Sequence, residues 1–108
     1  DYVKRQTRFT SRKPAKVIIS KMEAAARLMS FRVQTRNYKM RLEGFTTNKT
    51  GPLVVALEVF EVAPSLFMIE VRKVVGDTLE YHKFYKIFCA RLEDIIWKPI
   101  RVAGKSDV

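Results

Sequence analysis

Two runs rich in β-branched and aromatic residues, 53–63 and 66–74, most constrain how this chain can fold. Val, Ile and Phe favour strands, and Pro64 with Ser65 between the runs has the composition of a turn. The sequence therefore predicts two antiparallel strands joined by a short turn. The uninterrupted apolar stretch at 52–57 is far shorter than the about 18 residues that a membrane-spanning helix requires.

A second pair of segments also shows the two-residue period of strands. Apolar and polar side chains alternate over 31–34 and again over 38–42, and Arg36 with Asn37 offers a turn between them. This pattern predicts a hairpin with one apolar face and one largely cationic face. The Gly, Pro and polar residues of 44–52 indicate a loop after the hairpin.

Two further segments show the 3.6-residue period of amphipathic helices. The first is expected to begin at Pro14, which suits the first helical position, and to end near Ser30. The second is expected to begin at Asp77, whose spacing from Glu80 matches a capping box, and to run to about Trp97. Each helix has an apolar stripe that must be buried against another element of the fold. We therefore predict an α+β fold with two helices packed on one face of a four- to five-stranded antiparallel sheet.

The formal net charge of +10 is concentrated in the first part of the chain. Residues 1–41 hold twelve Lys and Arg against Asp1 and Glu23, whereas bases and acids balance over 42–108. This asymmetry predicts that one part of the surface attracts anions. The single cysteine, Cys89, cannot form an internal disulfide, so nothing indicates an oxidising compartment, and we expect a soluble intracellular protein.

The sequence contains no pattern of catalytic or metal-binding residues. His82 and Cys89 are seven residues apart on one face of a predicted helix, and two ligands of different softness do not make a metal site. No glycine belongs to a phosphate-binding loop. Two carboxylate pairs are better read as solvated surface than as acid and base. These pairs are Glu58 with Glu61 and Glu93 with Asp94. We predict a binding module with no cofactor, metal or catalytic residue.

The basic stretch 5–16, which surrounds Phe9, suits three classes of partner: nucleic acid, an anionic membrane and another protein. Nucleic acid is the weakest of the three, because core packing accounts for the alternating aromatic residues and no RNA-binding motif occurs. Those aromatic residues are Phe31, Tyr38, Phe60 and Phe67. Phe9 itself has two readings: a strand or staple residue that covers the core, or an exposed anchor for a partner.

Four motifs give the chain a family resemblance: TRF at 7–9, EVAPSLFM at 61–68, VRK at 71–73 and GDTLEYHKFYK at 76–86. With these motifs, about residues 4–98 closely resemble the C-terminal regulatory region of plant calcineurin B-like (CBL)-interacting protein kinases, particularly the salt-overly-sensitive branch. The resemblance implies a kinase-associated C-terminal fold over 8–98. Residues 1–7 show no apolar period and are expected to form a flexible lead-in, and 99–108, after the expected helix end, a flexible tail. The resemblance also implies that the parent chain is a Ser/Thr protein kinase of calcium, salt-stress and abscisic acid signalling. The expected location is cytoplasmic, peripheral at the plasma membrane through partners.

In this family the segment that matches residues 5–42 is the protein phosphatase interaction motif, which docks type 2C phosphatases. Arg8 with Phe9 matches the pair on which docking depends, and 37–39 matches the second half of the motif. The residues that the resemblance assigns to phosphatase docking are Arg5, Arg8, Phe9, Thr10, Asn37, Tyr38 and Lys39. An alternative function is binding of anionic phospholipids by the cationic face of the hairpin. Its expected residues are Arg32, Arg36 and Arg41.

The family also carries an Asn-Ala-Phe motif, which binds the CBL calcium sensor. This tripeptide is absent from the sequence. The resemblance therefore places it upstream of Asp1 and implies that the sensor binds mainly outside the present chain.

Overall fold

The computed structural model describes residues 7–45 and 51–97. They form five strands and two helices, and the predicted fold class is confirmed. The elements in chain order are β1 (Arg8–Ser11), α1 (Ala15–Leu28), β2 (Arg32–Arg36), β3 (Lys39–Phe45), β4 (Pro52–Ala63), β5 (Leu66–Val75) and α2 (Thr78–Arg91). The predicted tail, most of the predicted lead-in and the middle of the predicted loop lie outside the described residues.

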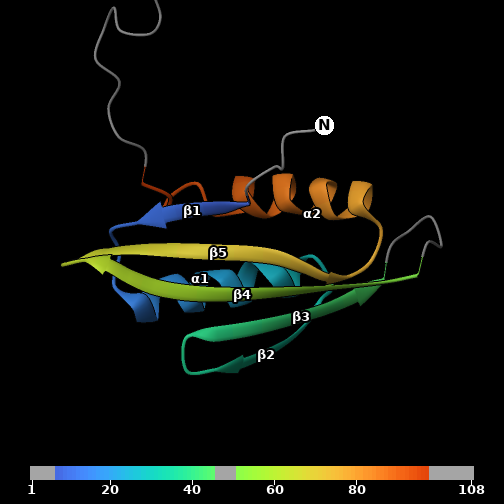
Figure 1. Ribbon diagram of the computed structural model, residues 1–108, viewed down its shortest axis with the longest axis horizontal. Coiled ribbons are helices and arrows are strands. Elements are labelled where there is room, and N and C mark those ends of the chain that lie inside the picture. The colour runs from blue at the N-terminus through green and yellow to red at the C-terminus, as the bar shows by residue number, and fades with distance from the viewer. Residues whose placement is uncertain (1–6, 46–50, 98–108) are drawn as a thin grey trace, which may run out of the picture.

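The five strands form one antiparallel sheet in the order β1-β5-β4-β3-β2. The first strand of the chain therefore pairs with the last one, and Figure 1 shows β1 beside β5 at the edge of the sheet. The other edge is β2. In the same view α1 crosses behind β4 and β5, which leaves the front of the sheet uncovered by that helix.

One hydrophobic core lies between the sheet and both helices. Alternate residues of the central strands are buried, such as Val55 and Leu57 on β4 and Ile69 on β5. Met22 of α1 and Phe88 of α2 join the same cluster, so both helices pack on one face of the sheet. Full burial of such side chains contributes about 1.5–3 kcal/mol each, which makes this layer the main source of stability.

Two of the predicted turns can be compared with the structure. Pro64 and Ser65 connect β4 to β5 as predicted, and Ser65 adopts a positive φ of 59°. The β2–β3 turn is one residue later than predicted, because Arg36 pairs with Lys39 across the hairpin. Its central residues are therefore Asn37 and Tyr38, and Asn tolerates the φ of 56° found at the first position.

The second helix begins as predicted and ends earlier. The Asp77 carboxylate accepts a hydrogen bond from the Glu80 main-chain N–H at 3.0 Å, as in a capping box. α2 ends at Arg91 rather than near Trp97, so the prediction of its C-terminus is wrong. Beyond the helix, the Ile95 N–H donates to the carbonyl of Leu92 at 2.9 Å, and Ile95 enters the core. The turn thus buries Ile95, a member of the same apolar stripe, without another turn of helix.

Two of the four alternating aromatic residues do not belong to the core. Phe31 and Phe67 pack against it as predicted. Tyr38 is exposed at the β2–β3 turn, and Phe60 lies on the face of β4 opposite the buried Val59, so the prediction is wrong for both. Tyr38 is a turn residue, where strand alternation no longer applies. For Phe60 the reason is that β4 carries apolar side chains at odd and even positions alike, and only the register with its neighbours decides which set is buried.

A candidate protein-docking surface on the open face of the sheet

The face of the sheet away from the helices is called here the open face. On β1 it displays Arg8 and Thr10, because successive side chains of a strand point to opposite sides. Phe9 points the other way, is half-buried and packs against the core. Of the two readings of Phe9, the structure therefore supports a strand residue that covers the core. Arg5, the other predicted docking residue at this end, lies outside the described residues.

The second half of the predicted motif lies at the turn between β2 and β3. The side chain of Tyr38 is 56% exposed, while its carbonyl accepts a hydrogen bond from the Val59 N–H at 2.9 Å and so holds the turn against β4. Lys39 is exposed at the start of β3, directly opposite Glu58. Asn37 is also exposed and provides the turn conformation.

The strand pairing brings the two halves onto one face without joining them. Arg8 on β1 pairs with Glu70 on β5, Glu70 pairs with Glu58 on β4, and Glu58 pairs with Lys39 on β3. Because neighbouring strands lie about 4.8 Å apart, this charged row spans about 14 Å from Arg8 to Lys39. The two cations at its ends belong to the segment that the resemblance selected, and the two carboxylates at its centre do not.

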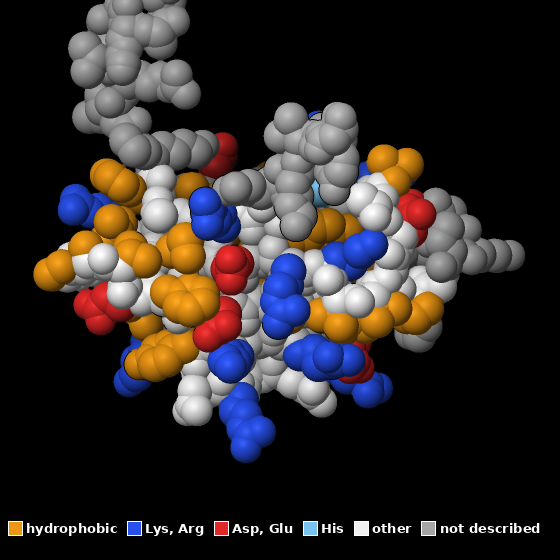
Figure 2. All heavy atoms as spheres, viewed as in Figure 1, with side chains coloured by type: hydrophobic (Ala, Val, Ile, Leu, Met, Phe, Trp, Pro, Cys, Tyr) orange, Lys and Arg blue, Asp and Glu red, His pale blue; other side chains and the backbone are white. Residues whose placement is uncertain are grey.

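A parallel apolar row lies two residues further along each strand. Thr10 pairs with Met68, and Met68 pairs with Phe60. Met68 and Phe60 are half-buried on the open face. Figure 2 shows hydrophobic side chains gathered at the end of this face where β4 turns into β5, next to acidic side chains. Sequence reasoning did not select the four central residues of the two rows, since only cross-strand register reveals that they lie between Arg8 and Lys39.

The cationic face predicted for the hairpin is present. Arg32, Arg36 and Arg41 are exposed and share the open face with Lys39. Arg41 forms an ion pair with Glu43 at 2.9 Å on the same strand. Basic side chains accordingly gather below the centre of the face in Figure 2. Their assignment to lipid remains a prediction.

The margin of the open face next to β1 is closed by the chain that follows α2. The Trp97 N–H donates to the Thr10 carbonyl at 2.8 Å, and the Arg12 guanidinium carbon lies 5.0 Å from the centre of the Trp97 ring. This distance allows a cation–π interaction. The prediction of a helix through Trp97 missed this contact, which an irregular segment makes.

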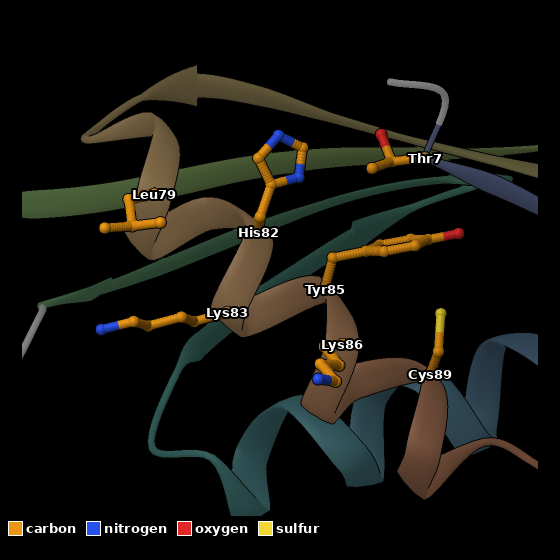
Figure 3. Close-up of a pocket in the computed structure, with 7 residues that line it drawn as sticks. All are labelled: Thr7, Leu79, His82, Lys83, Tyr85, Lys86 and Cys89. Carbon is orange, nitrogen blue, oxygen red and sulfur yellow. The ribbon is translucent and has the colours of Figure 1, made fainter.

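A separate cavity lies along α2. Its volume is about 600 Å³, and Figure 3 shows the side chains around it. These side chains are Thr7, Leu79, His82, Lys83, Tyr85, Lys86 and Cys89. Burial, followed by a hydrogen bond with Cys89, raises the pKa of Tyr85 well above its ordinary value, so this phenol stays protonated. His82 and Cys89 share this face as predicted, and the described residues contain no group of three metal-ligating side chains.

The fold has known counterparts among solved structures. The chain is similar to a crystal structure of the adenylate sensor from AMP-activated protein kinase complexed with ATP, with a TM-score of 0.67 and 13% identity over 85% of this chain and 98% of that one. A second structure of that sensor, in complex with 5-aminoimidazole-4-carboxamide 1-beta-D-ribofuranotide, matches with a TM-score of 0.65 and 10% identity. At such low identity the likeness shows the fold alone: a two-helix, five-stranded domain of the type found in that protein kinase.

The sequence comparisons give the family. The chain is 59% identical over 106 residues to CBL-interacting protein kinase 24 of Oryza sativa subsp. japonica, covering 98% of this chain and 23% of that protein. It is 55% identical over 108 residues to CBL-interacting serine/threonine-protein kinase 24 of Arabidopsis thaliana, covering 100% of this chain and 24% of that protein. The chain corresponds to the C-terminal regulatory region of the CBL-interacting protein kinases, and it spans about a quarter of the length of these curated relatives.

The family model of the NAF domain matches residues 3–35. The sequence prediction placed the Asn-Ala-Phe motif entirely ahead of this chain, and the tripeptide is indeed absent from it. The domain match nevertheless includes β1, α1 and most of β2. The segment assigned to phosphatase docking therefore overlaps the NAF domain, which sequence reasoning did not anticipate. None of the helices among the described residues is long and apolar enough to cross a membrane.

Proposed function

We propose that this domain docks a type 2C protein phosphatase through the open face and thereby connects the phosphatase to a Ser/Thr protein kinase in plant salt and abscisic acid signalling. The observation that carries the proposal is the placement of Arg8 and Lys39 at the two ends of one charged row. Residues that the family resemblance groups by sequence thus face one partner together. Thr10 adds polar contact area on the same face, and Tyr38 is exposed at the adjoining β2–β3 turn.

Phe9 has a supporting role in this proposal. Its ring packs against the core and holds β1 on the sheet, so that Arg8 is displayed on the other side. Removing the ring would weaken docking indirectly, through the position of the strand. Arg8 and Lys39 are therefore the better residues for a test, since both are exposed and neither belongs to the core.

The CBL calcium sensor is a second proposed partner. The relatives named above are CBL-interacting kinases, and the NAF-domain match covers β1 and α1. We expect the main sensor contact to lie upstream, as the resemblance implies, with the start of this domain at its border. Sensor and phosphatase then meet near β1. The proposed location of the whole kinase is cytoplasmic, at the plasma membrane through such partners.

Anionic phospholipid binding is the alternative function. It is supported by the exposed bases Arg32, Arg36 and Arg41, which face the same way from β2 and β3. Each base near an anionic surface contributes about 1 kcal/mol, and salt screens the interaction strongly.

The docking proposal is tested by calorimetry with a plant type 2C phosphatase and the variant Arg8→Ala with Lys39→Ala. We expect a loss of at least about 2 kcal/mol in binding free energy, as for clustered interface anchors. The matched control is Arg91→Ala with Lys86→Ala, which removes the same charges from exposed positions on α2. Circular dichroism checks that both variants fold. Equal affinity of the two double variants would remove the docking proposal.

A further inference from the structure

We infer that the centre of the open face, formed by Glu58 and Phe60 on β4 and Met68 and Glu70 on β5, is the specificity-determining part of the docking surface. It would receive an extended segment of the phosphatase that carries a Lys or Arg and, two residues away, an apolar side chain. The inference rests on the proposed docking function. All four residues lie outside the 5–42 segment.

Two carboxylates form the centre of the charged row. Glu58 and Glu70 are direct cross-strand neighbours, and both are half-buried. Like charges placed directly opposite one another destabilise a sheet. In the described part of the chain, no side-chain hydrogen bond or ion pair joins either carboxylate to a base, although Arg8 and Lys39 occupy the next positions in the row. Repulsion between the two carboxylates therefore opposes folding, and a cation from a partner would relieve it.

The bases around this pair leave room for such a cation. Arg8 and Lys39 are exposed at the ends of the row, about 14 Å apart by strand spacing. Arg41 is already paired with Glu43. Arg72, which lies in the next row opposite Ala56, is exposed. The two acids thus form a negative centre surrounded by separated positive groups.

The apolar row offers a second contact beside the carboxylates. Phe60 and Met68 are direct cross-strand neighbours on the open face, where neither contributes to the core. Aromatic residues and Met are enriched at protein interfaces, and a thioether beside an aromatic ring makes a favourable, adaptable contact surface. Val62 and Tyr38, which are 52% and 56% exposed, extend the apolar area at the same end of the sheet. Such a group fits an apolar anchor from a partner.

The geometry of the strands sets the spacing of the partner's groups. Glu58 and Phe60 are two residues apart on β4, as are Met68 and Glu70 on β5. Residues two apart on a strand lie about 6.7 Å apart on one side. An extended segment that follows β4 and β5 therefore places one side chain over the carboxylates and the next one on the same side over the Phe60–Met68 pair.

The central carboxylates also favour one class of partner over the others. A phosphate-rich surface, whether of lipid or nucleic acid, would be repelled by two acids at the middle of the contact. A protein can place a base there and acids near Arg8 and Lys39. Charge complementarity thus favours a polypeptide with mixed charges.

The test uses the full chain of 108 residues, a plant type 2C phosphatase and two variants. Glu58→Gln with Glu70→Gln is expected to weaken the affinity about tenfold or more, as for the loss of a desolvated charge pair. The same variant should unfold at an equal or higher urea concentration, because the like-charge repulsion is gone. Weaker binding by a domain that is no less stable cannot arise from unfolding. Phe60→Ala is likewise expected to weaken binding about tenfold.

Matched controls are available on the α2 side of the molecule. Glu93→Gln removes an exposed carboxylate, and Leu79→Ala truncates a side chain that is 64% exposed. Both should bind the phosphatase like the unmodified chain. Should the central variants bind as tightly as these controls while Arg8→Ala with Lys39→Ala binds weakly, the inference is overturned and the docking proposal stands. If all of these variants bind normally, both the inference and the docking proposal are contradicted. Stronger binding of the Gln variant to phosphatidylserine vesicles with unchanged phosphatase affinity would also overturn the inference, in favour of a membrane contact.

Discussion

The phenol of Tyr81 on α2 donates a hydrogen bond to the main-chain carbonyl of Val71 on β5 across 2.9 Å. The Thr7 hydroxyl donates to the same carbonyl and lies 2.6 Å from the Tyr81 oxygen, and the Val71 N–H donates to the Thr7 carbonyl at 2.9 Å. Three parts of the fold therefore meet at one buried polar cluster: the residue before β1, the neighbouring strand and the second helix. This cluster fixes the start of the strand that displays Arg8.

Tyr81→Phe removes one hydroxyl from this cluster and keeps the ring in the core. We expect the free energy of unfolding to fall by about 1 kcal/mol, because the Val71 carbonyl keeps the bond from Thr7 while one hydrogen bond is lost. Urea unfolding followed by circular dichroism measures this loss. The control is Tyr38→Phe at the exposed β2–β3 turn, where a change within about 0.5 kcal/mol is expected. Equal losses in the two variants would contradict a special role for the buried hydroxyl.

The stability of the domain should fall in alkaline solution because of Tyr85. Burial and the Cys89 hydrogen bond raise its pKa in the folded state, while an unfolded tyrosine titrates near pH 10. Above about pH 10 the unfolded chain loses a proton that the folded chain keeps, so the free energy of unfolding decreases as the pH rises. The pKa of Tyr81 is also raised, chiefly by burial, and this shift likewise lowers the free energy of unfolding in alkaline solution.

Tyr85→Phe isolates the contribution of one phenol to this pH dependence. We expect its unfolding free energy to decrease less steeply between about pH 9 and about pH 11 than that of the unmodified chain. Urea titrations at a series of pH values measure the two slopes. Identical slopes would show that Tyr85 does not titrate differently in the folded and unfolded states.

Most of the fold was predictable because local patterns and tertiary packing agree. The Pro64–Ser65 turn, the cap at Asp77 and the amphipathic stripe of α1 each depend on nearby residues, and all three are present. The end of α2 was not predictable from its apolar stripe. Ile95 is buried as the stripe requires, but a turn brings it there, and the pattern alone does not distinguish a turn from another helical residue.

Only part of the candidate docking surface could be predicted from the sequence. The family resemblance selects Arg8 and Lys39, which lie on the ends of the charged row, but the residues between them come from β4 and β5. Their position depends on antiparallel register over long sequence separations. β4 is apolar on both faces, so its alternation could not assign Phe60 to the open face. Only the paired strands reveal that β4 and β5 occupy the middle of the surface.

Gly76, between β5 and α2, should not accept a side chain. Its φ is +134°, and an added Cβ would lie 2.7 Å from Leu53 Cδ1 and 3.1 Å from the Pro52 carbonyl oxygen. We expect Gly76→Ala to lower the free energy of unfolding by about 2 kcal/mol or more, from backbone strain together with steric overlap.

The control for this substitution is Gly51→Ala. Gly51 has a φ of +102°, and an added Cβ would meet nothing within 4 Å. Its substitution should therefore produce backbone strain alone, of about 1–2 kcal/mol. Thermal and urea unfolding of both variants measure the difference. A loss at Gly76 no larger than that at Gly51 would show that Leu53 and Pro52 move aside freely.

The cationic hairpin provides the last test, which separates the lipid alternative from protein docking. Arg32, Arg36 and Arg41 face outward from β2 and β3. If they meet an anionic membrane, their combined replacement by Ala should weaken binding to phosphatidylserine vesicles by about 3 kcal/mol at low salt, since each base near the surface contributes about 1 kcal/mol. The control triple variant, Lys16→Ala with Lys83→Ala and Lys86→Ala, removes the same charge from exposed helix positions. Co-sedimentation at two salt concentrations measures both. Equal losses in the two triple variants would mean that net charge alone drives the association. The assignment of the hairpin to membrane binding would then be wrong.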